Sequence, residues 1–329
     1  MNTELLAKLE SIVSKDLKID EPMAKHSHYK IGGLATYFAT AQTSEEVVEL
    51  VRTAIVHELD WVVIGAGTNI LVNDAGFDGL VIKMANRSIQ IDETSGEVVA
   101  EAGALSAMVA RQTAMQGLTG FEWAVGLPGT IGGAVRGNAG CFGGETKDNL
   151  VSVDIVDGET GELRSVSAKK LKMGYRESEV KNKPWIVLRA HFKLEPRDIE
   201  RNMEKIEDVL QCRATSQPKN ERCAGCAYKN FEFADLADIA ELVDVIGKEN
   251  IPPNFIDQKR IPAGWIIDQA GLKGFKVGGA SISDVHGNFV INGDDATADH
   301  IVQLLAAVKT KVRNLYGVQL EEEIQLIGF

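Results

Sequence analysis

The sequence lacks a surplus of basic residues, a long apolar run and a cysteine-rich framework. Its 329 residues carry a formal net charge of -12, so the basic face that nucleic-acid binding requires is not expected. No apolar run approaches the roughly 18 to 20 residues of a membrane span. The first twenty residues are charged throughout and lack the features of an export signal; they predict a helix instead. We therefore expect a cytoplasmic protein whose partners are small molecules. Our prediction for its oligomeric state, a monomer, does not follow from these features.

The four cysteines are too few for a disulfide framework in a chain of this length. Cys223 and Cys226 are separated by two residues, with Cys212 shortly upstream, a spacing that suits a zinc site, a redox pair or one catalytic cysteine. A zinc or iron–sulfur site needs four ligands and this segment supplies three, so we predict no metal. A redox motif usually begins a helix after a strand, whereas this one precedes AYKN. Catalysis by Cys226 is the third alternative.

Composition and periodicity predict a folded α+β chain. Hydrophobic residues make up 44% and charged residues 25%, as in ordinary globular proteins, and the length suggests about two domains. Thr43 or Ser44 is the predicted N-cap of one helix, with Glu46 completing a capping box. Thr297 and Gly317 bound another helix with a single apolar face. Further patterns predict helices at 104–115 and 197–211, strands at 61–67, 79–84 and 318–328, and hairpins at 88–103 and 151–167.

Two glycine-rich stretches indicate a ligand that approaches the backbone closely. The first starts at Gly65 after a strand, but Ile70 stands where a dinucleotide fingerprint needs its third glycine, and an extended segment follows instead of a helix. The second, residues 126–144, contains eight glycines, which lose much backbone freedom on folding. Tight turns are the alternative for both. We expect the two loops to hold phosphates of one long ligand through converging N–H groups.

A series of motifs then gives the chain a resemblance to a known family: GAGTNILV with GFDGLVI, GLPGTIGGAVRGNAG, YRES, GCAYKN, AGWIIDQAGLKG and LEEEIQLIG. From about Lys25 onward it resembles the UDP-N-acetylenolpyruvoylglucosamine reductases, the flavoenzymes of bacterial peptidoglycan precursor synthesis, and among them the compact second subtype. The resemblance implies an α+β fold with a two-part FAD-binding domain of the vanillyl-alcohol-oxidase type and a C-terminal α+β substrate-binding domain. It places the FAD-binding parts at 1–86 and 87–200, the latter joined by the C-terminal strand 317–329, and the substrate domain at 201–316.

The resemblance also implies the ligands. FAD would be the cofactor, NADPH the reductant, and UDP-N-acetylglucosamine enolpyruvate the substrate that is reduced to UDP-N-acetylmuramate. In such enzymes the reduced flavin gives a hydride to the terminal vinyl carbon, and negative charge develops at the neighbouring carbon and its carboxylate. By resemblance, the FAD-binding residues are Gly65, Gly67, Thr68, Asn69, Ile70, Gly126, Pro128, Gly129, Thr130, Gly132, Gly133, Asn138, Ala139 and Gly140.

Three residues match the catalytic positions of that family. Arg176 in YRES would stabilise the substrate carboxylate as charge develops, a role that suits the planar guanidinium. Cys226 would be the proton donor in place of the usual serine, since a thiol with a reference pKa of about 8.5 releases a proton far more readily than a hydroxyl. Glu323, the third acid of LEEEI, would assist, although strand alternation alone does not separate it from Glu321.

Other motif positions suit the substrate's sugar or diphosphate: Tyr175, Arg213, Gln217, Lys229, Asn230, Lys273 and His286. Phe231 replaces the proline that follows Lys-Asn in the family, so the turn there is expected to differ. Two other classes of protein would keep the glycine-rich loops and lack the combination of Arg176, Cys226 and Glu323. One is a different FAD oxidoreductase of the same fold, and the other is a nucleotide-binding protein without catalysis.

Overall fold

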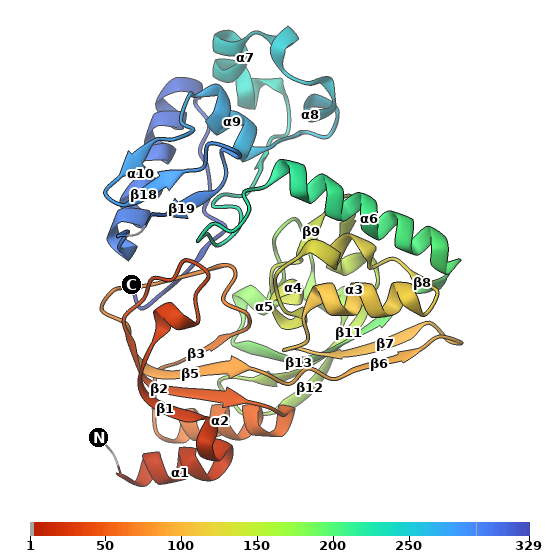
Figure 1. The fold of residues 1–329 in the computed structure, drawn as a ribbon, viewed down its shortest axis with the longest axis vertical. Coiled ribbons are helices and arrows are strands. Elements are labelled where there is room, and N and C mark those ends of the chain that lie inside the picture. Colours follow the sequence, from red (N-terminus) through yellow and green to blue (C-terminus); the bar gives the residue numbers. More distant parts are fainter. Residues whose placement is uncertain (1–2, 294) are drawn as a thin grey trace. The chain divides into compact units, whose positions relative to one another are not determined.

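The computed structural model describes residues 3–293 and 295–329, which form two compact units (Figure 1). Each unit has its own core of buried apolar side chains, as domains do. Unit 1 contains the residues up to Glu21, Leu34–Gly67 and Phe77–Thr215, and unit 2 contains Pro22–Gly33, Thr68–Gly76 and Ser216–Phe329.

Unit 1 begins with a four-stranded sheet covered on one face by two helices (Figure 1). Its elements are α1 (Thr3–Val13), β1 (Leu17–Pro22), β2 (Leu34–Ala41), α2 (Ser44–Val56), β3 (Trp61–Ile64) and β5 (Phe77–Met84). The strand order is β1-β2-β5-β3, and β2 and β3 both run parallel to β5, so the chain crosses over between them, through α2 in one case. Thr43 accepts a hydrogen bond from the N–H of Glu46, which confirms it as the predicted cap. The predicted capping box is wrong in its second half, because the Glu46 carboxylate accepts from the N–H of Gln42 and not from that of Thr43.

The second sheet of unit 1 has five antiparallel strands. They are β6 (Ile89–Asp92), β7 (Glu97–Glu101), β11 (Leu150–Asp157), β12 (Leu163–Ser167) and β13 (Trp185–Lys193), in the order β12-β11-β13-β7-β6. The pairings β6–β7 and β11–β12 confirm both predicted hairpins. Helix α3 (Ser106–Met115) and the short α4 (Ile131–Arg136) lie over this sheet, with α4 in contact with β7 and β13 (Figure 1). The glycine-rich residues 126–144 are therefore carried by a rigid sheet.

The remaining elements of unit 1 connect this sheet to a long helix. They are β8 (Leu118–Thr119), β9 (Gly140–Cys141), β10 (Gly144–Glu145), α5 (Glu179–Asn182), β14 (Glu195–Pro196) and α6 (Ile199–Ser216). Helix α6 confirms the helix predicted at 197–211 and continues past it. Its Asn202 is fully buried and donates to the carbonyl of Leu118 at 3.2 Å, which fixes the helix to unit 1.

Unit 2 is built from short strands and helices around one long helix. They are β4 (Ile70–Val72), β15 (Phe231–Glu232), α7 (Ala240–Ile246), α8 (Pro253–Asp257), β16 (Arg260–Ile261), α9 (Ala263–Gln269), β17 (Lys276–Val277), β18 (Ala280–Ile282), β19 (Val290–Asn292), α10 (Ala298–Tyr316) and β20 (Gln325–Ile327). As predicted, α10 begins after the capping hydroxyl of Thr297 and ends at Gly317 in the left-handed conformation. Both units mix helices and strands, and most of the strand pairings are antiparallel, so the α+β prediction is confirmed.

The C-terminal strand differs from the expectation. A strand was predicted over 318–328, but β20 covers only Gln325–Ile327. It pairs in parallel with β4 within unit 2, not with a strand of residues 87–200. Of the acidic residues before it, Glu322 forms an isolated antiparallel bridge with Tyr228, so the predicted strand is not one continuous ladder. The division into 1–86, 87–200 and 201–316 stays a prediction about function.

Candidate active site

The two predicted cofactor loops are in direct contact within unit 1. Gly65 follows β3 and Thr130 is the N-cap of α4, and a Cβ atom at Gly65 would overlap the Thr130 hydroxyl. Gly132 is also constrained, because its Cβ would lie 3.0 Å from that of Ala102. Gly133, in contrast, is exposed, and the nearest atom to its Cβ would be 3.7 Å away. Close packing inside the protein requires glycine at positions 65 and 132. No neighbouring protein atom requires it at position 133, where close approach of a ligand would do so.

The backbone N–H groups of the two loops have different partners. Those of Ile131 and Gly132 donate to carbonyls of residues 104 and 102, at 2.9 Å each, so they do not join the predicted anion-binding group. In the first loop, no N–H of residues 65–69 donates a hydrogen bond within the part of the chain that the structure describes. Gly67 has a φ of 72°, and turns of this kind point successive N–H groups to one side. The first loop therefore fits a pyrophosphate better than the start of α4 does.

Two buried polar atoms beside the second loop also fit a bound cofactor. Ser106 Oγ and Trp123 Nε1 are buried and have no hydrogen-bond partner among the described residues. The Ser106 N–H donates to the carbonyl of Gly129 at 3.0 Å, and the exposed Pro128 precedes that glycine. Buried polar groups without a hydrogen-bond partner are uncommon in native proteins, so a bound ligand is a reasonable source of the partner for each atom. Ser106 and Trp123 were not predicted as site residues, because neither belongs to a recognisable sequence pattern.

Asn138, which lies in the second loop just after α4, connects that loop to residues 145–147 and to Gly174. It is fully buried with a φ of 39°, and Ala139 beside it is half-buried. Its Nδ2 donates to Glu145 Oε2 and to the carbonyl of Gly174, both at 2.7 Å, while Oδ1 accepts from the N–H of Lys147 at 3.0 Å. Both amide hydrogens and the oxygen are used inside the protein, so this side chain positions the loop.

Arg176 lies next to the same loop. It occupies a tight turn closed by backbone hydrogen bonds between Gly174 and Glu177. Its φ of 55° is unusual for a residue other than glycine, and such strain is often held at functional sites. Its Nη2 donates to the carbonyl of Gly140 at 2.9 Å, and its guanidinium carbon lies 5.1 Å from the centre of the Tyr175 ring. The structure thus brings the predicted catalytic arginine to a predicted cofactor residue.

Arg213, near the end of α6, also lies against this loop. A Cβ atom at Gly126 would be 2.6 Å from Arg213 Cδ. Burial raises the pKa of the Cys141 thiol, and the positive charges of Arg213 and Arg176 act in the opposite direction. The Cys141 Sγ donates to the Trp123 carbonyl at 3.3 Å. Two guanidinium groups therefore gather beside the loop, and such local cations suit an anionic ligand.

Cys226 and Glu323 are brought together in unit 2. Cys226, a half-buried thiol outside any disulfide, forms a β-bridge with Phe289. The carbonyl of the next residue, Ala227, accepts from the N–H of Glu323 at 2.8 Å. Asn69 Nδ2 donates to the Glu323 carbonyl at 3.2 Å. The predicted proton donor and the predicted glutamate are therefore neighbours across one short pairing.

The end of the first loop belongs to the same region of unit 2. Ile70 opens β4 and pairs with Gln325 of β20. The Thr68 carbonyl would lie 4.0 Å from a Cβ atom at Gly225, immediately before the cysteine. Residues 68–70 and the segment around residue 226 are thus close neighbours, although they are far apart in the sequence.

Burial separates the three acids of the C-terminal segment. The Glu321 side chain is 70% exposed and pairs with Lys229 Nζ at 3.2 Å. Glu322 pairs with Lys309 at 2.8 Å. Glu323 is half-buried. Strand alternation alone left Glu321 and Glu323 equivalent and the family resemblance selected Glu323; the difference in exposure also favours Glu323.

The remaining predicted substrate residues are less closely grouped. Lys273 Nζ pairs with Asp268 at 2.9 Å. The Asn230 side-chain oxygen accepts from the N–H of Ala263 at 3.2 Å. Gln217 is half-buried directly after α6. Lys273 and Asn230 are therefore held by protein partners, which a substrate would have to share or replace.

His286 is held in one orientation inside unit 2. Its Nδ1 accepts from the N–H of Asn288 at 3.1 Å, which leaves the proton of the neutral ring on Nε2. The ring packs edge-on against Phe289 at 4.9 Å, and a Cβ atom at Gly264 would lie 2.6 Å from its Cε1. Burial lowers the pKa of His286, and the charge of Lys273 lowers it further. Near neutral pH it is therefore a neutral ring beside the cysteine segment.

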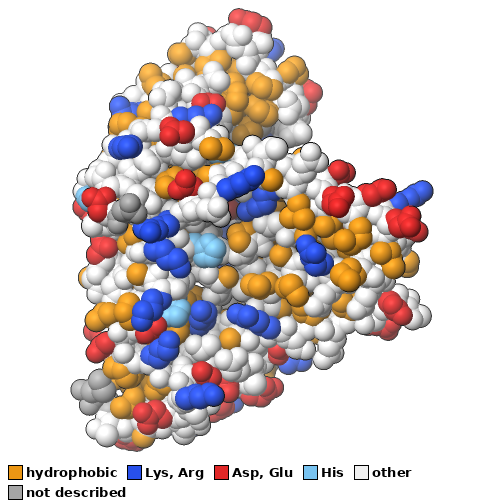
Figure 2. Space-filling model, in the orientation of Figure 1, with side chains coloured by type: hydrophobic (Ala, Val, Ile, Leu, Met, Phe, Trp, Pro, Cys, Tyr) orange, Lys and Arg blue, Asp and Glu red, His pale blue; other side chains and the backbone are white. Residues whose placement is uncertain are grey.

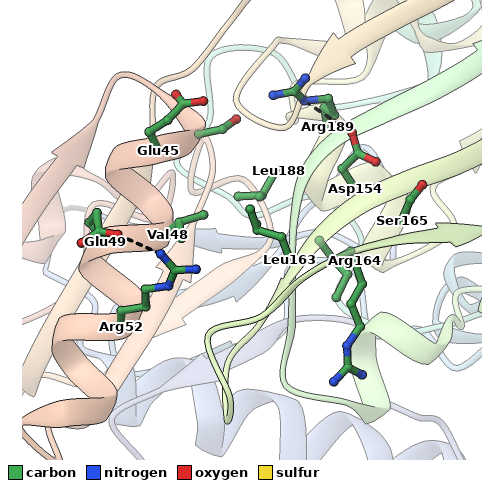
Figure 3. Close-up of a pocket in the computed structure, with 12 residues that line it drawn as sticks. Glu45, Val48, Glu49, Arg52, Asp154, Leu163, Arg164, Ser165, Leu188 and Arg189 are labelled. Carbon is green, nitrogen blue, oxygen red and sulfur yellow. Dashed lines mark hydrogen bonds and ion pairs between the residues drawn. The ribbon is translucent and has the colours of Figure 1, made fainter.

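A separate cavity in unit 1, of about 470 Å³, lies between α2 and the strands β11 to β13 (Figure 3). None of the residues that line it was predicted as a site residue. Val48, Leu163 and Leu188 form its apolar part, and Arg52 and Arg189 flank it (Figure 3). Both arginines are paired with carboxylates of the same cavity, so its charges are already balanced. We assign no ligand to it.

Acidic and basic side chains are interspersed over the face drawn in Figure 2, so the net charge of -12 does not produce a uniformly acidic surface there. Among the described residues, no group of three or more His, Cys, Asp or Glu side chains could hold a metal ion. No helix in residues 3–293 or 295–329 is long and apolar enough to cross a membrane.

Known proteins are similar to the whole chain. The family pattern of the FAD binding domain matches residues 35–167, and that of the UDP-N-acetylenolpyruvoylglucosamine reductase C-terminal domain matches 217–327. The reductase of this name from Lachnoclostridium phytofermentans is 36% identical over 100% of this chain and 98% of its own, and that from Clostridioides difficile is 33% identical over 99% of each. The crystal structure of the Thermus caldophilus reductase superposes with a TM-score of 0.73 at 31% identity, covering 94% of this chain and 99% of that one. These matches confirm the predicted fold, with its FAD-binding domain and C-terminal domain.

Proposed function

Because the chain belongs to the UDP-N-acetylenolpyruvoylglucosamine reductase family of FAD-dependent oxidoreductases, we propose that it reduces UDP-N-acetylglucosamine enolpyruvate to UDP-N-acetylmuramate with NADPH. This reaction serves peptidoglycan precursor synthesis. The observation that supports it most is the backbone hydrogen bond between Ala227 and Glu323. It places Glu323 beside the segment of Cys226, and both residues carry side chains that can transfer protons. We propose that residues 1–86 and 87–200 form the FAD-binding parts and 201–316 the substrate-binding domain of a cytoplasmic monomer. The matches of the FAD-binding pattern to 35–167 and of the reductase C-terminal pattern to 217–327 support this division.

FAD would be held by the predicted residues of 65–70 and 126–140. The N–H groups of residues 65–69 suit its pyrophosphate, and Ser106 Oγ and Trp123 Nε1 suit its other polar groups. When bound, FAD supplies the substrate's terminal vinyl carbon with a hydride taken from NADPH. The protein's own residues have the remaining tasks of holding the substrate and delivering a proton.

Cys226 would deliver that proton to the carbon beside the substrate carboxylate. The S–H bond breaks as the new C–H bond forms, and the thiolate then regains a proton from water. A thiol is largely protonated near neutral pH and gives up its proton more readily than a serine hydroxyl. General acids of this kind contribute about 10²- to 10⁴-fold in rate. Glu323 would assist proton delivery from its half-buried position.

Arg176 would pair with the substrate carboxylate as negative charge develops. Its hydrogen bond to Gly140 and its strained turn fix the guanidinium before substrate binds, so little reorganisation is needed. Arg213 and Tyr175 would bind beside it. Lys229 and Lys273 would exchange their carboxylate partners for the diphosphate, and Asn230, Gln217 and His286 complete the proposed substrate residues.

The test is a steady-state assay on the purified, FAD-loaded protein. We expect NADPH oxidation that depends on the enolpyruvyl sugar nucleotide, and a product that mass spectrometry identifies as the sugar nucleotide plus a hydride and a proton. An oxidase of the same fold would instead consume oxygen with a sugar or alcohol and need no NADPH. That pattern, or NADPH oxidation that ignores the sugar nucleotide, would overturn the proposal.

A further inference from the structure

Asn288 makes several hydrogen bonds with the segment that follows Cys226. It is 2% exposed and lies two residues before the start of β19 at Val290. Its side-chain oxygen accepts from the N–H of Tyr228 at 2.9 Å, and its Nδ2 donates to the Tyr228 carbonyl at 2.8 Å. Its own carbonyl accepts from the N–H of Ala227 at 2.8 Å. One side chain therefore replaces the backbone partner that a regular strand would give Tyr228.

The other side of the same segment carries the glutamate. Glu323 donates its N–H to the Ala227 carbonyl at 2.8 Å, and Lys229 donates to the Glu321 carbonyl at 2.9 Å. Residues 227–229 are thus held between Asn288 and residues 321–323. Cys226 directly precedes these residues, so the orientation of its side chain depends on how the backbone of residues 227–229 is held.

The orientation of Asn288 is itself fixed. Its N–H donates to His286 Nδ1 at 3.1 Å, and the His286 ring is confined by Phe289 and by the lack of a side chain at Gly264. Because Tyr228 is 1% exposed, its N–H and carbonyl would be left buried without these partners if the amide were removed. The backbone after Cys226 would then have to move to find others.

We propose that Asn288 is a positioning residue that aligns Cys226 and Glu323 for proton delivery to the substrate, a role that rests on the function proposed above. It touches neither the substrate nor the cofactor in this account. It acts through residues 227 and 228, which connect the proton donor to the glutamate.

The variant is Asn288→Ala, and Asn292→Ala is its matched control. Asn292 is also a buried asparagine, 7% exposed, whose Nδ2 donates to a tyrosine carbonyl, that of Tyr29, at 2.6 Å. Removing the Asn292 side chain breaks one buried amide–carbonyl hydrogen bond in the same unit, where Asn288→Ala breaks two, and it leaves residues 226–229 and their partners in place. We expect Asn288→Ala to slow reoxidation of the reduced flavin by substrate about 10- to 100-fold, as small misalignments do. Flavin reduction by NADPH should change less than about twofold, and Asn292→Ala should leave both rates near those of the unsubstituted protein.

Two further measurements separate positioning from general support of the fold. In a Cys226→Ala background, Asn288→Ala should add little further slowing, because the group it aligns is already absent. Alkylation of Cys226 by iodoacetamide, followed by peptide mass mapping, needs neither NADPH nor substrate and should accelerate several-fold in Asn288→Ala but not in Asn292→Ala. Full additivity in the Cys226→Ala background, equal slowing by Asn292→Ala or unchanged alkylation would overturn the positioning role. If the unsubstituted protein shows no substrate-dependent reoxidation, the proposed function fails, and the alkylation comparison still decides whether Asn288 aligns Cys226.

Discussion

Replacing Gly133 by alanine should strengthen the fold and weaken cofactor binding at the same time. Gly133 lies inside α4, is exposed, and would place a Cβ atom no closer than 3.7 Å to any neighbour. Alanine is more favourable than glycine in a helix interior by up to about 1 kcal/mol. We therefore expect Gly133→Ala to raise the free energy of unfolding of the FAD-free protein by a comparable amount, measured by urea denaturation.

The effect on FAD has the opposite sign if close approach of the ligand explains this glycine. A methyl group forced into a filled site typically costs about 1 to 3 kcal/mol. This corresponds to a dissociation constant for FAD that rises about 5- to 150-fold. Titration of the FAD-free protein, followed by flavin fluorescence, measures it. Gly65→Ala is the contrasting variant, because its methyl group would collide with the Thr130 hydroxyl and should destabilise the FAD-free protein itself.

The two variants give opposite outcomes, so the reasoning can fail clearly. If Gly133→Ala lowers the stability of the FAD-free protein as Gly65→Ala does, the claim that a methyl group fits at position 133 is refuted. If its stability rises and FAD affinity is unchanged, the glycine is not there for the cofactor, and the link between glycine content and ligand approach is refuted for α4.

Three other predictions concern the Cys226 thiol, two buried tyrosines and the buried Glu122. Cys226→Ala should slow flavin reoxidation by substrate about 10²- to 10⁴-fold and leave NADPH reduction nearly intact in stopped-flow experiments; equal slowing of both would contradict its role as acid. Burial raises the pKa of Tyr29 and Tyr228, so above about pH 10 the unfolded chain ionises while the folded one does not, and each tyrosine should lower stability by about 1.4 kcal/mol per pH unit. Tyr228→Phe should make the slope shallower by about 1.4 kcal/mol per pH unit in urea denaturation at alkaline pH, and an unchanged slope would show that Tyr228 does not contribute to it. Burial alone would raise the pKa of Glu122, but hydrogen bonds, the largest from Thr119, lower it overall, so its contribution is present above about pH 4.5 and lost on acidification. Glu122→Gln should flatten the loss of stability below that pH, and an equally steep loss would show that other groups cause it.

Local patterns predicted the elements of the fold well, because their causes are local. Thr297 and Gly317 bound α10 through a cap and a left-handed residue, both of which depend on a few adjacent positions. The partition of the chain depends on tertiary contacts. Segments 22–33 and 68–76 pack with unit 2 although the residues around them belong to unit 1, and no change of composition marks these boundaries. The pairing of β20 with β4 has the same cause.

The candidate site shows the same limit. Sequence motifs identified Arg176 and Cys226, but not their neighbours. In the structure Arg176 donates to the Gly140 carbonyl, and Glu323 donates its N–H to the carbonyl of Ala227, the residue after Cys226. Asn288 escaped notice because its bonds to Tyr228 span 60 residues of sequence, and a single asparagine carries no periodic signal.

The most direct test of the account is an anaerobic, two-step reduction followed at the flavin absorption band. The FAD-loaded protein is first reduced with a stoichiometric amount of NADPH, and UDP-N-acetylglucosamine enolpyruvate is then added. We predict that the band bleaches in the first step and returns in the second, with formation of UDP-N-acetylmuramate. A band that does not bleach with NADPH, or that bleaches and does not return with this substrate, would contradict the proposed function.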